Sequence, residues 1–207
     1  MIELLWPSTC HACGIEGEGP LCPRCTPGQV HRPGRVIPGI HGLVTSSGYD
    51  SGVGRALRAA KYGNRRDLAV RLARGFAQAV APAIRPRPQV IVPVPSPWST
   101  LLQRGFSTTS LLAQALAHPL QLPVVHALMA SPGPRQASMT TRGRAENARS
   151  RIRSVDQHLS RIVGCTVLLI DDVVTTGATA SACAQELLGS GAHRVVLATL
   201  CFTRDAR

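Results

Sequence analysis

Residues 167–181 of the chain read VLLIDDVVTTGATAS, and the fold that the sequence predicts follows from this stretch. Its apolar part, with Thr166 before it, is too short for a helix and rich in branched side chains, which predicts a buried parallel strand. Asp171 and Asp172 follow at once, where such a strand is expected to leave its sheet. Open α/β folds place their ligands at that edge.

The residues after the two acids predict a phosphate-binding loop. They have small side chains, one glycine and three hydroxyls: Thr175, Thr176, Gly177, Ala178 and Thr179. A helix is expected over about residues 180–188, and the N–H groups and dipole of a helix start attract phosphate. An ordinary helix cap needs only one acid or threonine. Two acids and three threonines instead favour a sugar phosphate, with carboxylates on its hydroxyls and amides on its phosphate.

The run IDDVVTTGAT, residues 170–179, resembles the 5-phosphoribosyl-1-pyrophosphate (PRPP) signature of type I phosphoribosyltransferases. Its setting in the chain is similar to the ComF family of phosphoribosyltransferase-like proteins. The resemblance implies an α/β fold, with a type I phosphoribosyltransferase-like parallel sheet flanked by helices. It also implies that Asp171 and Asp172, the expected catalytic residues, hold the ribose hydroxyls, and that residues 175–179 hold the 5′-phosphate. Mg²⁺ would bind with PRPP, and an enzyme of this kind would transfer phosphoribosyl to an acceptor without a covalent nucleophile.

Two C-x-x-C pairs near the N-terminus predict a structural zinc site. The first pair is Cys10 and Cys13, and the second is Cys22 and Cys25. Two such pairs can complete a closed tetrahedral sulfur site, and the metal would stabilise a module too small to fold alone. Unrelated thiols or a redox pair are the alternative, and His11 could replace one cysteine as a ligand. ComF-like chains commonly begin with such a zinc-ribbon-like module.

The composition is that of a globular chain with room for one full domain and a small appendage. The chain has 207 residues and 44% hydrophobic residues, enough for a core without disulfides. Residues 26–40, here called the connector, carry several prolines and glycines without a period. We therefore expect a cysteine-knuckle module and connector over residues 1–35 and an α/β domain over residues 36–207. Without a signal sequence or an apolar run of membrane-spanning length, a cytoplasmic protein is expected.

Periodic segments predict the remaining elements of the domain. Apolar residues at four-residue steps after Asp67 indicate an amphipathic helix, and β-branched runs indicate strands. Expected helices cover residues 53–60, 67–83, 107–117 and 180–188, and expected strands cover residues 42–49, 89–94, 166–170 and 194–202. Lys61 would then lie in a loop after the first helix.

Three further segments carry candidate ligand contacts. The resemblance implies a phosphate or pyrophosphate contact for Lys61, although an exposed surface lysine is also consistent with its position. Pro93, Val94 and Pro95 end a strand and would form the pyrophosphate loop by the same resemblance, or simply end the strand. Arg104 begins the sequence Arg-Gly-Phe, which is similar to an element of ComF-like chains that usually continues with asparagine. Here Ser107 follows, and Arg104 could bind phosphate bidentately.

The net charge of +12 favours a polyanionic partner, although an arginine-rich genome could also produce it. The basic residues concentrate between residues 128 and 156, where Gln136, Arg144 and Asn147 resemble a family hood over the active site. A mobile arginine loop there could close on pyrophosphate, follow a nucleic-acid backbone, or simply be solvated. A second hypothesis is therefore a non-catalytic protein that senses a ribose phosphate or binds single-stranded DNA with the competence machinery for DNA uptake. The family's association with natural competence implies that role.

Overall fold

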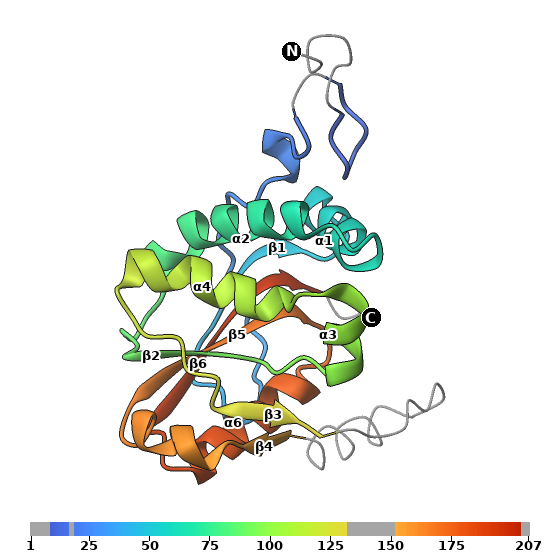
Figure 1. The fold of residues 1–207 in the computed structure, drawn as a ribbon. Coiled ribbons are helices and arrows are strands. Elements are labelled where there is room, and N and C mark those ends of the chain that lie inside the picture. Colours follow the sequence, from blue (N-terminus) through green and yellow to red (C-terminus); the bar gives the residue numbers. More distant parts are fainter. Residues whose placement is uncertain (1–8, 17–18, 132–151, 204–207) are drawn as a thin grey trace.

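Four parallel strands form the central sheet of the computed structural model, which describes residues 9–16, 19–131 and 152–203. Their order is β1-β6-β5-β2 (Figure 1). The strands are β1 (Leu43–Gly48), β6 (Arg194–Phe202), β5 (Thr166–Val174) and β2 (Val90–Pro93). All three strand pairings are parallel, so the carboxyl ends of the strands meet at one edge of the sheet.

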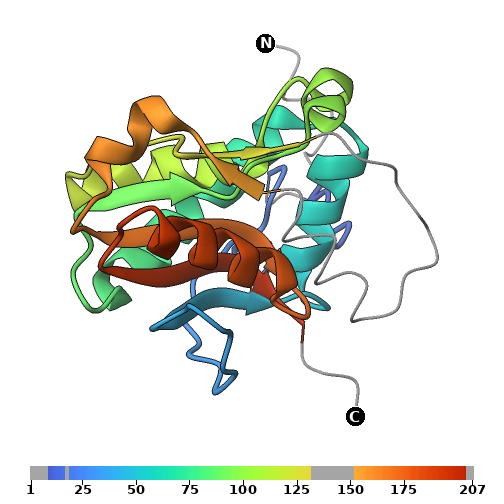
Figure 2. The ribbon, with the colours of Figure 1, turned by 90° about the horizontal axis from the view of Figure 1, so that it is seen from below.

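Helices cover both faces of the sheet (Figures 1 and 2). One face packs against α1 (Gly52–Tyr62), α2 (Arg66–Val80) and α4 (Thr108–Leu120). The other face packs against α6 (Ala178–Gly189), which lies in front of the sheet in Figure 2. The predicted fold class, a parallel sheet flanked by helices, is therefore confirmed.

The alternation of side chains along β5 explains why this strand is apolar throughout. Leu168 and Ile170 belong to the core beneath α1, α2 and α4, whereas Val167 and Leu169 belong to the core beneath α6. All four side chains are fully buried. Successive residues of a strand face opposite sides, so a strand with helices on both faces needs apolar side chains at every position.

Smaller elements complete the described chain. A short helix, α3 (Trp98–Arg104), follows β2, and β3 (Leu128–Ala130) pairs antiparallel with β4 (Ile152–Ser154). Single 3₁₀ turns occur at η1 (Pro23–Cys25), η2 (Ala81–Ala83) and η3 (Asp156–Arg161). The sequence does not predict α3, β3 or β4, because three to seven residues are too few for a periodic pattern.

Two expected boundaries near the candidate site are wrong. The strand expected to end at Ile170 continues as β5 to Val174, so both acids lie within it. Lys61 lies in the last turn of α1 instead of in a loop. By contrast, the last strand has the predicted bounds, Arg194–Phe202. None of the helices in the described ranges is long and apolar enough to cross a membrane.

The cysteine module packs on α1 and α2, on the side of these helices away from the sheet (Figure 1). A Cβ added to Gly52, the first residue of α1, would lie 2.6 Å from the Sγ atom of Cys25. A Cβ added to Gly75 of α2 would lie 2.9 Å from Pro27. Arg55 also donates a hydrogen bond to the carbonyl oxygen of Ala12 at 3.0 Å. These contacts fix the module on the helices, while the boundary near residue 35 stays a prediction.

Candidate functional site

The acid-bearing end of β5 extends beyond its neighbour β2. The last pair of the β2–β5 register joins Pro93 to Ile170, and the N–H of Val94 donates to the carbonyl oxygen of Ile170 at 2.8 Å. Pairing of β5 with β6 continues to Val174. Residues 171–174 therefore have a ladder partner on one side only within the described chain. The loops that follow β2 and β5 leave neighbouring strands at the same edge of the sheet.

Asp171 is buried, with 8% of its surface exposed, and its charge acts on Cys183 of α6. Its Oδ1 atom accepts a hydrogen bond from the N–H of Asp172 at 2.8 Å. Burial raises the pKa of the Asp171 carboxyl to about 7, and the charge of Asp172 adds to the increase. Near neutral pH this carboxyl is therefore only partly ionised.

Asp172 forms an ion pair with Lys61. The distance between Lys61 Nζ and Asp172 Oδ2 is 2.7 Å, and less than a fifth of each side chain is exposed. The last turn of α1 carries the lysine to the strand, so the structure brings these two predicted site residues together.

The predicted phosphate loop lies between β5 and α6. Gly177 is buried and has a φ of +80°, in the left-handed region that glycine adopts without strain, and it forms the N-cap of α6. Thr175, Thr176 and Thr179 are exposed, and the N–H of Ala178 donates to the hydroxyl of Thr176 at 3.3 Å. The first N–H groups of any helix lack an intrahelical acceptor, so the loop presents donors suited to an anion.

A chain of hydroxyl groups anchors the predicted pyrophosphate loop. The hydroxyl of Thr109 donates to the carbonyl oxygen of Val94 at 2.8 Å, and Ser107 links Thr109 to Ser96 through contacts of 2.9 and 3.0 Å. Pro93 and Val94 are buried, and Pro95 is half-buried. Ser107 accepts a hydrogen bond from the N–H of Ser110 and so caps α4.

Arg104 ends α3 beside the end of α1. Its guanidinium carbon lies 5.9 Å from the ring centroid of Tyr62, and Gly105, with a φ of +72°, ends the helix. Figures 1 and 2 both show α3 next to the carboxyl end of α1. Lys61 contacts the candidate acid Asp172, whereas the contact given for Arg104 is with Tyr62, the residue after Lys61. The expected hood residues Gln136, Arg144 and Asn147 lie outside the described residues.

The four predicted cysteine ligands form one cluster. The Sγ atoms of Cys10, Cys13, Cys22 and Cys25 all lie within 4.8 Å of one another, close to the spacing of about 3.8 Å that a tetrahedral zinc site requires. His11 is not part of the cluster, and its Nε2 atom instead contacts Arg65 at 3.2 Å. Among the described residues, the geometry therefore favours four sulfur ligands that could hold zinc.

The thiols of the cluster titrate differently. Burial raises the pKa of Cys10, but hydrogen bonds from the backbone of Cys22, Ala12 and Cys13 outweigh it and lower the pKa to about 6. Burial and the neighbouring sulfur atoms raise the pKa of Cys25. Four adjacent thiolates repel one another, and a divalent cation would remove that repulsion.

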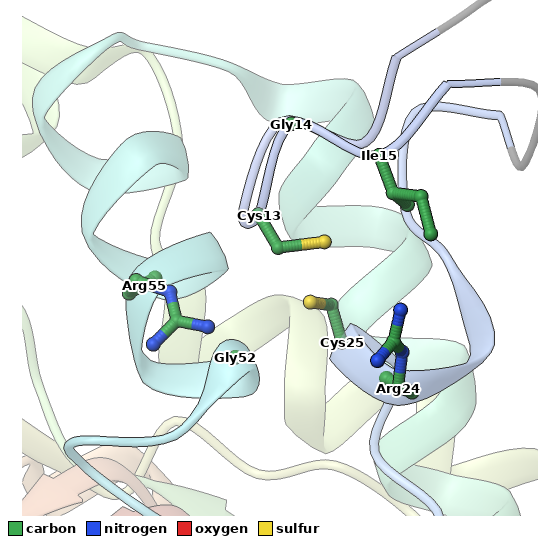
Figure 3. Close-up of a pocket in the computed structure, with 7 residues that line it drawn as sticks. All are labelled: Cys13, Gly14, Ile15, Arg24, Cys25, Gly52 and Arg55. Carbon is green, nitrogen blue, oxygen red and sulfur yellow. The ribbon is translucent and has the colours of Figure 1, made fainter.

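A surface pocket adjoins the cysteine cluster at the start of α1 (Figure 3). It has a volume of about 330 Å³, and Cys13 and Cys25 line it together with Arg24 and Arg55. A zinc ion held by four thiolates would carry a net charge of −2, which these two arginines complement. We therefore regard the pocket as part of the surroundings of the cysteine centre.

No protein-family model matches the chain. The chain is 32% identical to the DNA utilization protein YhgH of Salmonella typhi over 207 residues, with 95% of this chain and 85% of that protein covered. It is 30% identical to the protein of the same name from Escherichia coli K12 over 196 residues, with 88% and 84% covered. The chain belongs to the YhgH family. The resemblance of this YhgH-family chain to ComF proteins stays a prediction.

Solved structures with a similar arrangement include phosphoribosyltransferases. The glutamine PRPP amidotransferase of B. subtilis is 17% identical with a TM-score of 0.44, over 61% of this chain and 25% of that one. The hypoxanthine phosphoribosyltransferase of Trypanosoma cruzi is 18% identical with a TM-score of 0.39, over 67% and 70%. Both TM-scores are below 0.5, so we base no conclusion on these two similarities.

In this YhgH-family chain, the sequence did not predict that two connector residues contact the loop of residues 175–179. They are Arg35 and Ile37. The guanidinium of Arg35 donates to the carbonyl oxygen of Thr175, and Ile37 packs against Gly177. In the sequence they lie 140 residues away from the loop, within a segment rich in proline and glycine. No local pattern marks such a contact.

We expect Asp171 to make the YhgH-family chain less stable as the pH rises from about 5 to about 8. The folded state holds this proton up to a pKa of about 7, whereas the unfolded state releases it near 4, so the folded state binds more protons between these values. The free energy of unfolding of Asp171→Asn minus that of wild type should therefore increase by about 2 to 3 kcal/mol from the lower to the higher of these two pH values. Urea denaturation at both pH values measures this difference.

Asp67→Asn is the matched control. Asp67 is an exposed acid whose pKa is lowered to about 2, mainly by its hydrogen bond with Arg65. Its stabilising effect is complete above pH 4, so this variant should shift stability equally at both pH values. An Asp171→Asn effect that is equally independent of pH would contradict the raised pKa of Asp171.

Proposed function

We propose that this YhgH-family chain binds PRPP or a related ribose 5-phosphate, with Mg²⁺, at the carboxyl end of β5. The observation that carries the proposal is the succession of a buried acid, an ion-paired acid and a helix-start loop at the open edge of a parallel sheet. Asp171 and Asp172 would hold the ribose hydroxyls, and residues 175–179 would hold the 5′-phosphate. The pyrophosphate would lie towards residues 93–95, where the neighbouring strand ends.

The donor set suits a magnesium ion. Carboxylate and phosphate oxygens are the ligands that Mg²⁺ prefers in proteins. Because the pKa of the Asp171 carboxyl is about 7, binding of a cation there would displace a proton near neutral pH. When bound, Mg²⁺ would neutralise part of the charge on the pyrophosphate.

Transfer of phosphoribosyl to an acceptor is the reaction that this site would support. The bond between ribose C1 and the pyrophosphate oxygen breaks with its electrons on the leaving group, while the acceptor forms a bond to C1. Positive charge develops on the sugar ring, where the carboxylates of Asp171 and Asp172 stabilise it. Lys61 and Arg104 supply cations for the negative charge on pyrophosphate.

We expect the wild-type chain to bind PRPP in the presence of Mg²⁺ and the double variant Asp171→Asn, Asp172→Asn to bind it at least about tenfold more weakly. The substitution keeps the shape of both side chains but removes the charges that attract the cation. Isothermal titration calorimetry with and without Mg²⁺ measures the effect. Asp67→Asn serves as the control for loss of an exposed acid. Equal affinities of wild type and double variant, or no binding by either, would refute the proposal.

We also propose that the cysteine cluster holds one structural zinc ion. Four sulfur atoms at tetrahedral spacing form a closed site, without a position for substrate. The contact of Gly52 with Cys25 places the first turn of α1 directly against this centre. Zinc would therefore stabilise both the module and its packing on α1.

Metal analysis of the purified chain should find about one zinc per molecule, and Cys22→Ser should lower this content strongly. Cys22 is buried and its sulfur lies 3.6 Å from that of Cys13. The substitution therefore removes one of the four expected sulfur ligands. The matched control is Cys165→Ser, which changes a thiol outside the cluster and should leave the zinc content unchanged. Full zinc content in Cys22→Ser would exclude the four-sulfur site.

Single-stranded DNA binding is the second candidate function. Two observations favour it: the net charge of +12 and the name of the relatives, DNA utilization protein. Arginines that neutralise phosphates release counterions, which makes such binding strongly dependent on salt. The arginine-rich segment between residues 128 and 156 would supply these contacts, together with the ribose-phosphate site or without it.

Neutralisation of four arginines in that segment should weaken single-stranded DNA binding and reduce its salt dependence, by about 0.7 in log–log slope for each DNA phosphate that the protein no longer neutralises. The variant replaces Arg142, Arg144, Arg149 and Arg151 with glutamine. A control replaces four exposed arginines of other segments, Arg66, Arg71, Arg74 and Arg87. Fluorescence anisotropy over a range of salt concentrations provides the measurement. Binding that does not depend on salt, or an equally large decrease in affinity in both variants, would argue against this function for the segment.

A further inference from the structure

The connector contacts the end of the sheet from which the phosphate loop emerges. The guanidinium of Arg35 donates from Nη1 to the carbonyl oxygen of Thr175. The same guanidinium lies over the ring of Phe202, with 5.1 Å between its central carbon and the ring centroid. Phe202 ends β6 and pairs with Val174, the last residue of β5. Arg35 therefore contacts both the end of β6, at Phe202, and the first residue of the loop, Thr175.

Ile37 makes a second contact between the connector and the loop. Its side chain is buried, with 3% of its surface exposed. A Cβ added to Gly177 would lie 2.9 Å from Cδ1 and 3.0 Å from Cγ1 of Ile37. The loop backbone thus packs directly on this side chain, and Gly177 leaves the space that the contact requires. Arg35 and Ile37 together hold the loop at two points, two residues apart.

Because the peptide bond is planar, the Arg35 contact also affects which way the loop backbone faces. The carbonyl of Thr175 and the N–H of Thr176 belong to one planar trans peptide, in which they point in opposite directions. A carbonyl fixed towards Arg35 therefore turns the N–H of Thr176 away from the connector. This N–H lies one residue before Gly177, the N-cap of α6, and so directly precedes the free N–H groups of the helix start that would face a phosphate.

We infer that Arg35 is a positioning residue for the loop of residues 175–179 and orients the Thr176 N–H towards the 5′-phosphate of the ligand. The inference rests on the ribose-phosphate site proposed above. Arg35 acts through the Thr175 carbonyl and need not touch the ligand itself. Its charge makes the hydrogen bond stronger than a neutral one. The positive guanidinium also favours an anion nearby.

Arg32 provides a matched control within the same connector. Its guanidinium also donates to a backbone carbonyl, that of Ala83, which lies at the end of η2 and not in the loop. Arg32→Ala and Arg35→Ala therefore remove the same side chain and the same kind of hydrogen bond, three residues apart. Only Arg35→Ala should affect the loop.

The first measurement needs no ligand. For residues 175–179, backbone order parameters from ¹⁵N relaxation should be about 0.85 in wild type and in Arg32→Ala. In Arg35→Ala they should be below about 0.6. Arg35→Lys keeps a charged donor and should give intermediate values. If Arg35→Ala does not fold, the comparison of Arg35→Lys with Arg32→Ala decides the question. Equal order parameters in the arginine variants would overturn the inference.

The second measurement uses two probes in calorimetry, ribose 5-phosphate and inorganic pyrophosphate. Arg35→Ala should bind ribose 5-phosphate about fivefold to twentyfold more weakly than Arg32→Ala, while its affinity for pyrophosphate should be unchanged. A purely structural role would instead weaken both probes equally and would overturn the inference. If the wild-type chain binds neither ribose 5-phosphate nor PRPP, the proposed function fails. The order parameters then still decide whether Arg35 positions the loop.

Discussion

The different lengths of two neighbouring parallel strands are the constraint on which the candidate site depends. β2 ends at Pro93, opposite Ile170, whereas β5 continues through both acids to Val174 with β6 as its partner. Beyond Ile170, β5 therefore stays paired with β6, while its edge towards β2 has no strand partner among the described residues. In this part of β5, Asp171 is buried, and Asp172 has a partner on α1.

Helix α1 links the cysteine centre to this strand end. Its first residue, Gly52, lies against Cys25, and its last turn carries Lys61 to Asp172. The connector makes a second link, because it leaves the cysteine module and reaches the phosphate loop at Arg35 and Ile37. The cysteine module is therefore packed on the same elements that position the acids and the loop. A metal in the module would stabilise that arrangement from a distance.

The electrostatics of the strand end combine acids with nearby cations. Burial raises the pKa of Asp171, while Lys61 balances the charge of Asp172 at a short distance. Arg35 of the connector contacts Thr175, directly after β5. An arrangement with both signs of charge at close range suits a ligand that presents hydroxyls and a cation on one side and phosphates on another. The metal-bound sugar phosphate that we propose as the ligand has these features.

The sequence by itself determined the parallel sheet flanked by helices, the approximate bounds of its longer elements and the four clustered cysteines, because each of these depends on local composition and periodicity. The phosphate role of residues 175–179 stays a prediction. The sequence predicted the strand Arg194–Phe202 correctly, yet placed the end of the acidic strand too early. Only the tertiary structure decided that Lys61 pairs with Asp172 and that Arg35 contacts Thr175. These contacts join residues more than one hundred positions apart, and no local pattern specifies which distant surfaces meet when the chain packs.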